Sequence, residues 1–126
     1  YLYSRGRRTL HAQLVMRFRF VLVEYPFDEL SRSKVRPALC LTEPLGKKRY
    51  ITVAFMTSQM PTTLESTEMM IDDTHEDFGS TGLRTASVIQ LHRVFSVPES
   101  LILRKLGMLP RTLQDEVKAK LASLFL

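Results

Sequence analysis

Val-Arg-Pro-Ala-Leu-Cys-Leu, residues 35–41, joins a polar segment to an apolar strand predicted over Ala38–Thr42. Pro37 restricts Arg36 to an extended backbone, and the fixed φ of a proline suits the first residue of a strand. We therefore expect Arg36 at the rigid beginning of a strand. A guanidinium stays charged and presents a planar fork of donors that fits a phosphate. Arg36 is thus a candidate phosphate contact, and an ordinary surface arginine is the alternative.

Three strands are predicted around this stretch. Phe18–Tyr25 is rich in aromatic and β-branched residues, Ala38–Thr42 follows, and Tyr50–Met56 is the third. The connections are short, which favours an antiparallel meander. The middle of the first strand, residues 20–23, is apolar on both faces, and burial on both faces suits a small closed barrel.

The second half of the chain predicts shorter elements and a terminal helix. The pattern indicates strands at Thr67–Ile71, Ala86–Leu91 and Val94–Val97, a short helix at Pro98–Leu106 and an amphipathic helix at Arg111–Leu124. The fold class is therefore mainly β, with a C-terminal helix on a small SH3-like barrel of antiparallel strands.

Length and charge narrow the class of protein. The chain has 126 residues and a net charge of +5, which favours an anionic partner, nucleic acid first and a membrane surface second. No apolar run approaches the roughly 20 residues that span a bilayer. Arg5, Arg7 and Arg8 supply +3, so the rest carries 5 − 3 = +2. We expect residues 1–17 to be an extension outside the domain, an upstream piece or a start misplaced ahead of Met16, and residues 18–126 to be the domain.

Cys40 could indicate a nucleophile and the acidic residues of 72–77 a metal site, but a structural interpretation is favoured for both. Cys40 is the only cysteine, so no intrachain disulfide can form, and its place in an apolar strand indicates an inert core thiol. The acidic residues of 72–77 lack a turn-forming glycine that would gather them around one ion, so a solvated loop is favoured. No metal or other cofactor is expected.

Arg36 and Thr57 are predicted to converge. Arg36 begins the second strand and Thr57 follows the third, so an antiparallel pair places them at the same end of the sheet. Ser58 and Gln59 add uncharged hydrogen-bonding groups there. A cation with neutral donors suits a phosphodiester, whereas metal-dependent hydrolysis needs carboxylate or imidazole ligands. For Thr57 alone, a strand-end hydroxyl bonded to the backbone is the alternative.

Five short motifs, in this order and spacing, resemble the MazF/PemK toxins of type II toxin–antitoxin systems. They are Val-Leu-Val-Glu-Tyr-Pro-Phe (21–27), Ser-Lys-Val-Arg-Pro-Ala-Leu (33–39), Phe-Met-Thr-Ser-Gln (55–59), Ser-Val-Ile-Gln-Leu (87–91) and Arg-Lys-Leu-Gly-Met-Leu (104–109). The resemblance runs from about Phe18 to the C-terminus. Two departures stand out: Phe18-Arg19 replaces the usual Gly-Asp, and the first loop has no glycine.

The resemblance implies a cytoplasmic homodimer that cleaves single-stranded RNA, such as mRNA, without a metal and is neutralised by an antitoxin protein. It implies that Arg36 and Thr57 are the catalytic pair, acting while the RNA 2′-hydroxyl attacks the adjacent phosphorus. The candidate RNA-binding residues around them are Arg32, Lys34, Ser58, Gln59 and Arg84, and the possible general acid and base are Glu24 and Glu29. A plain surface arginine is the alternative for Arg84, and a solvated loop carboxylate is the alternative for each glutamate.

Two other functions remain open. Toxins of the same barrel family poison gyrase without cutting nucleic acid, through a Trp-bearing C-terminal tail. This chain has no Trp and ends in Leu124-Phe125-Leu126. A degenerate member that binds RNA without cutting it is the second alternative.

Overall fold

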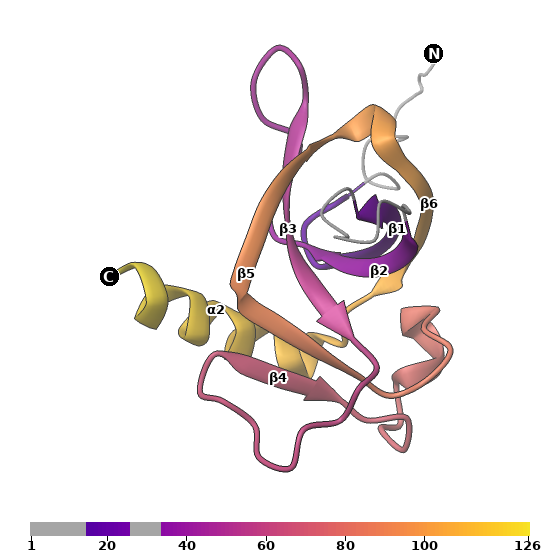
Figure 1. Cartoon of the computed structure of the whole chain (residues 1–126), viewed down its shortest axis with the longest axis vertical. Helices are drawn as coiled ribbons and strands as arrows, with labels where there is room; N and C mark the ends of the chain where they lie inside the picture. The colour runs from indigo at the N-terminus through magenta and orange to yellow at the C-terminus, as the bar shows by residue number, and fades with distance from the viewer. Residues whose placement is uncertain (1–14, 26–33) are drawn as a thin grey trace.

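One antiparallel sheet of six strands carries the fold, in the order β4-β5-β3-β2-β1-β6 (Figure 1). The computed structural model describes residues 15–25 and 34–126. Its elements are β1 (Arg19–Tyr25), β2 (Lys34–Cys40), β3 (Tyr50–Thr57), β4 (Glu68–Ile71), η1 (Phe78–Thr81), β5 (Ser87–Pro98), η2 (Glu99–Leu101), β6 (Ile102–Met108) and α2 (Arg111–Phe125). The prediction of a mainly β protein with a C-terminal helix is confirmed. The sheet curls like a barrel, but the strand pairing does not close it between β4 and β6.

The predicted meander is confirmed in the first three strands. β2 pairs antiparallel with β1 from Phe20↔Leu39 to Tyr25↔Lys34, and with β3 from Ala38↔Phe55 to Cys40↔Val53. The second strand begins earlier than predicted, at Lys34, because β1 offers a partner before β3 does.

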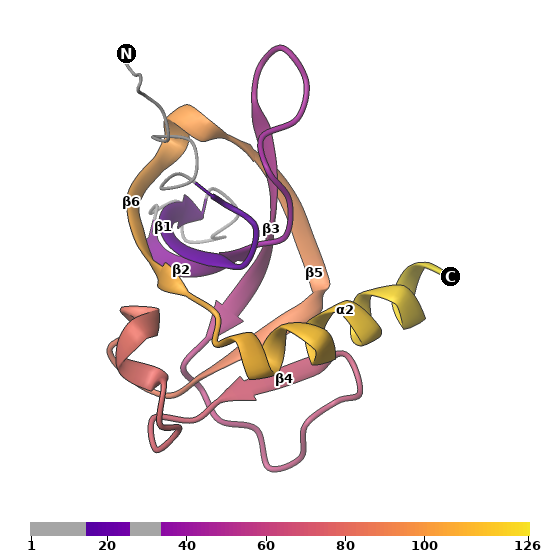
Figure 2. The same ribbon diagram turned by 180° about the vertical axis from the view of Figure 1, so that it is seen from behind.

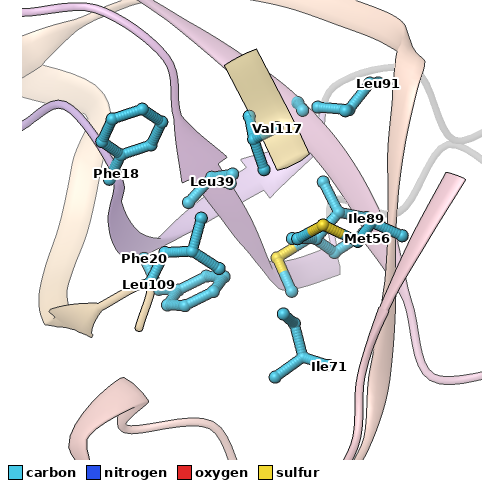
Figure 3. Packing of buried hydrophobic residues seen from close by; sticks show 11 residues of the cluster. Phe18, Phe20, Leu39, Met56, Ile71, Ile89, Leu91, Leu109 and Val117 are labelled. Atoms are coloured by element: carbon cyan, nitrogen blue, oxygen red, sulfur yellow. The ribbon is translucent and has the colours of Figure 1, made fainter. Parts of the chain in front are cut away.

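Both faces of the sheet are buried, as the apolar residues of β1 indicate. Val21 and Val23 lie inside the curl, in the inner core, which also holds Cys40, Ile51, Val53 and Val97. Phe20 lies on the other face, in the helix-side core. There α2 crosses the sheet (Figure 2), and Val117 of α2 lies near Leu39 and Leu91 in the same core (Figure 3). Because successive side chains of a strand point to opposite faces, β1 contributes residues to two separate cores.

The two strands predicted at 86–91 and 94–97 are one strand, β5, interrupted by a bulge. Ala54 of β3 pairs with Val94, whereas the next residue, Phe55, pairs with Gln90. Leu91, His92 and Arg93 therefore have no opposite residue on β3. Such a bulge bends a strand and re-aims its side chains, and bulges are common beside functional sites.

The helix predicted at Pro98–Leu106 is wrong. Only Glu99–Leu101 form a single 3-10 turn, and the chain then continues as β6, which pairs with β1 from Ile102↔Val23 to Met108↔Arg19. The reason is tertiary, because β1 would otherwise expose an unpaired edge, and this outweighs the local helical preference.

The segment before β1 is anchored to the sheet. Residues 1–14 of the extension expected at 1–17 lie outside the described residues. Met16 is 1% exposed and belongs to the inner core. Its backbone N–H lies 3.1 Å from both carboxylate oxygens of Glu43, and the N–H of Arg17 donates to the same group at 3.0 Å.

The 72–86 loop is fixed by a close approach to β6. Gly82 adopts the left-handed conformation (φ 77°), which favours glycine. Gly107 of β6 lies so near the loop that a Cβ there would collide with the backbone carbonyl of Ser80. This contact positions the part of the loop that carries Arg84.

Gly107→Ala should lower the free energy of unfolding by about 1–3 kcal/mol, the usual cost of forcing extra atoms into a packed site. Gly79→Ala is the matched control, since nothing lies within 4 Å of a Cβ at Gly79. Urea denaturation of the two variants measures the difference. Equal midpoints for both variants and the parent protein would show that the loop shifts away from β6 freely.

Candidate functional site

Polar side chains gather where the pairing of β2 with β3 ends, and we call this place the Arg36–Thr57 rim after the two residues that lie there. The β2–β3 pairing ends at Ala38↔Phe55, one residue past Pro37, whose nitrogen has no hydrogen to donate to a neighbouring strand. Two further steps along each strand in opposite directions reach Arg36 and Thr57. The register therefore places these two residues across from each other at the same end of the sheet, as predicted.

Two pockets flank this rim. We call the first the aromatic pocket: it has a volume of about 340 Å³, and its lining includes Tyr25, Lys34, Phe55, Gln59, Gln90 and Arg93. We call the second the leucine pocket: it has a volume of about 410 Å³, and its lining includes Leu22, Leu83, Arg84, Arg104, Lys105 and Leu106. Arg36, Met56, Thr57 and Ser58 line both. A group bound at Arg36 and Thr57 thus has a separate hollow on each side.

Arg36 is exposed and is available to an anion. Within residues 15–25 and 34–126, its guanidinium makes no side-chain hydrogen bond and no ion pair. The backbone beside it is held by Tyr25, whose hydroxyl donates to the Pro37 carbonyl at 2.6 Å. Burial raises the pKa of Tyr25 to about 12, so the hydroxyl keeps its proton and this bond at neutral pH.

The Thr57 hydroxyl has a defined direction. Its oxygen accepts a hydrogen bond from the Gln59 backbone N–H at 3.1 Å. This is the strand-end contact to the backbone considered as the alternative from the sequence. An oxygen that accepts from the backbone still has its own hydrogen to donate. The contact therefore orients the hydroxyl and is compatible with a second bond to a phosphate oxygen.

Four of the predicted RNA-binding residues lie in this region. Lys34 and Gln59 line the aromatic pocket, Arg84 lines the leucine pocket, and Ser58 lines both. Arg32 lies outside the described residues.

The candidate acid and base are not brought to the rim by the described structure. Glu24 pairs with Val35, and alternation places both on the opposite face of the β1–β2 pair from Arg36. Glu24 lines neither pocket. Glu29 lies outside the described residues.

The sequence analysis did not predict that strands β3, β5 and β6 add further cations and aromatic rings to the site. Arg93 lies with its Cζ 4.4 Å from the centroid of the Phe55 ring. The Phe55 ring also packs edge to face against Tyr25, with 4.4 Å between the ring centroids, and against Phe95, with 4.5 Å between the ring centroids. Arg104 and Lys105 of β6 face the leucine pocket. The signal for Arg93 was its place between two apolar runs of one strand, which is where a bulge turns a side chain aside.

Other candidate chemistry has structural explanations. Cys40 is fully buried, and burial raises the pKa of its thiol to about 12, so it is a core thiol and not a thiolate nucleophile. In the acidic loop, Asp72 accepts a hydrogen bond from the Thr74 N–H at 3.0 Å, which lowers the pKa of its carboxyl. Among the described residues no three His, Cys, Asp or Glu side chains gather as metal ligands, and none of the helices is long and apolar enough to cross a membrane.

A curled antiparallel sheet with a guanidinium and a hydroxyl between two cation-lined pockets defines a small β protein whose site suits a phosphodiester. The family model described as a PemK-like, MazF-like toxin of type II toxin–antitoxin systems matches residues 16–125. The chain belongs to this family, which confirms the resemblance that the sequence motifs carry.

Solved structures share the fold. The Mycobacterium tuberculosis toxin MazF-mt6 superposes with a TM-score of 0.63 at 21% identity, over 85% of this chain and 95% of that one. A second structure, described as an Mtb toxin, gives a TM-score of 0.56 at 24% identity, over 71% of this chain and 92% of that one. No curated protein matches the sequence. At these identities the structural likeness concerns the fold alone.

Proposed function

We propose that this protein is the toxin of a type II toxin–antitoxin pair and cleaves single-stranded RNA at the Arg36–Thr57 rim. The observation that carries the proposal is the placement of Arg36 and Thr57 across the open end of β2 and β3, between two pockets. Family membership supports the first part of the proposal, because the family model describes toxins of type II toxin–antitoxin systems. An RNA substrate and an antitoxin partner both place its action in the cytoplasm.

The proposed reaction is a transphosphorylation that needs no metal. The RNA 2′-hydroxyl gives its proton to water as its oxygen attacks the adjacent phosphorus, and the bond to the 5′-oxygen breaks. The 5′-oxygen takes up a proton from water, so the products are a 2′,3′-cyclic phosphate and a 5′-hydroxyl end. Negative charge grows on the non-bridging oxygens, where the Arg36 guanidinium stabilises it. The Thr57 hydroxyl donates to one of these oxygens while the Gln59 N–H holds it in place.

The RNA on either side of the cut would use the two pockets. Arg84, Arg104 and Lys105 line the leucine pocket, while Lys34 and Arg93 line the aromatic pocket. Cations on both sides of one phosphate site suit a chain of regularly spaced phosphates.

Arg36→Ala should lower the cleavage rate by about 10²–10³, the typical effect of removing one preorganised donor to a developing oxyanion. Arg111→Ala is the matched control, since Arg111 is exposed at the start of α2 and lines none of the pockets around the rim. Thr57→Val should lose rate, whereas Thr57→Ser should keep most of it. The assay is cleavage of a mixed RNA pool in EDTA, with the new ends mapped.

Retention of cleavage within about tenfold in Arg36→Ala would remove Arg36 from the catalytic role. Dependence on magnesium, or 5′-phosphate ends, would contradict the transphosphorylation. RNA that binds in an Arg36-dependent manner but is never cut would identify the degenerate, binding-only member.

We propose a homodimer as well. Met69 of β4 is buried in the helix-side core and gives no support. Leu101 and Leu103 do give support, because they are 57% and 54% exposed beside the edge strand β6. Light scattering at micromolar concentration should give twice the chain mass of 14.5 kDa, or about 29 kDa. A species of the single-chain mass would contradict the proposal.

An acidic antitoxin should neutralise the protein by covering the rim. Lys34, Arg36 and Arg93 attract carboxylates as they attract phosphates, and a disordered acidic segment can fold along such a surface. Titrating a cognate antitoxin into Arg36→Ala protein bound to labelled RNA should release the RNA. Antitoxin that binds while the RNA stays bound would place the two sites apart.

A further inference from the structure

We propose that Arg93 selects the base of a nucleotide beside the cleaved phosphodiester, and that it favours a base edge with two adjacent acceptors. The inference rests on the proposed function, because it assumes that RNA lies across the Arg36–Thr57 rim. It adds a specificity-determining residue to that site.

Arg93 is stacked rather than free to sweep the solvent. Its Cζ lies 4.4 Å from the centroid of Phe55, whose ring packs against Tyr25 and Phe95. A guanidinium over an aromatic face is stabilised by the cation–π interaction, and its N–H donors remain available at the edge of the guanidinium plane. The three rings therefore form a fixed platform that holds the Arg93 fork inside the aromatic pocket.

A chain of hydrogen bonds orients the same fork. Arg93 Nη1 donates to Gln90 Oε1 at 3.1 Å, and Gln90 Nε2 donates to Glu68 Oε2 at 3.4 Å. Glu68 is 8% exposed, and its other oxygen accepts from the Glu65 N–H at 2.9 Å. Gln90 and Glu68 thus act as positioning residues, and the remaining donors of Arg93 have a preferred direction.

An oriented guanidinium fork discriminates among bases by their acceptors. It pairs with two adjacent acceptors, as offered by guanine O6 and N7 or by cytosine O2 and N3, whereas adenine and uracil have no two acceptors side by side. Single-stranded RNA exposes these edges and stacks its bases on aromatic and arginine planes. A phosphate also fits such a fork, but in the proposed complex Arg36 and Thr57 already hold the phosphate at the rim. The aromatic platform and the hydrogen-bond chain therefore favour a base as the partner of Arg93.

The test compares the base composition at mapped cut sites of a randomised RNA pool. The parent protein should show guanine or cytosine enriched at one position next to the cut. Arg93→Ala should lose that enrichment by roughly tenfold, the discrimination expected from one bidentate arginine contact. Arg93→Lys keeps the charge but not the fork, so it should lose the preference as well. Arg111→Ala, the exposed control, should keep it.

Modified RNAs identify the base. 7-Deazaguanosine at the preferred position lacks N7 and should slow cleavage by the parent protein but not by Arg93→Ala. 3-Deazacytidine tests cytosine in the same way. An unchanged preference in Arg93→Ala overturns the proposal, as does a uniform loss of rate at all sites, which would make Arg93 a phosphate contact. Thermal unfolding of each variant shows that the fold is retained.

Binding separates this proposal from the proposed function. A randomised pool with 2′-O-methyl groups throughout cannot be cut, and its bound fraction can be sequenced. A guanine or cytosine preference that disappears in Arg93→Ala supports base selection even if the protein cuts no RNA. The same sequences bound by the parent and Arg93→Ala proteins would overturn base selection even if cleavage is confirmed.

Discussion

Pro37 has no N–H to offer a neighbouring strand, and the pairing of β2 with β3 stops beside it. β2 continues to Lys34 along β1 alone, so its end diverges from β3. This divergence opens the sheet where Arg36 and Thr57 stand, and both pockets lie on either side of it. A residue able to complete the ladder would draw the strands together, and the rim would lose its opening.

The rim stays open because the sheet behind it is held from both faces. Val21 and Val23 pack in the inner core, and Phe20 packs in the helix-side core, to which Val117 of α2 also belongs. Each fully buried side chain of this size contributes about 1.5–3 kcal/mol, far more than an exposed polar contact contributes. The packing of the two cores therefore fixes the positions of the strand ends. The position of the Arg36 backbone depends on this packing and not on weak surface bonds.

The sequence was informative where local pattern and chain order agree. Apolar runs separated by short turns predicted the meander, and the meander alone brought Arg36 to Thr57. It was uninformative where a distant partner decides the structure. Residues 102–108 became a strand because β1 lay unpaired, and Arg93 joined the aromatic pocket because β5 bulges against β3. Neither partner is visible from the residues themselves.

The bulge is the place where β5 passes from one core to the other. Before it, Ile89 packs in the helix-side core, and after it Val97 packs in the inner core. Because the side chains of a strand alternate with a period of two, one inserted residue more or fewer would turn one half of the strand to the wrong face. The two cores therefore fix the bulge, and the bulge in turn places Arg93 over Phe55. The position of a residue in the candidate site follows from the packing of the whole sheet.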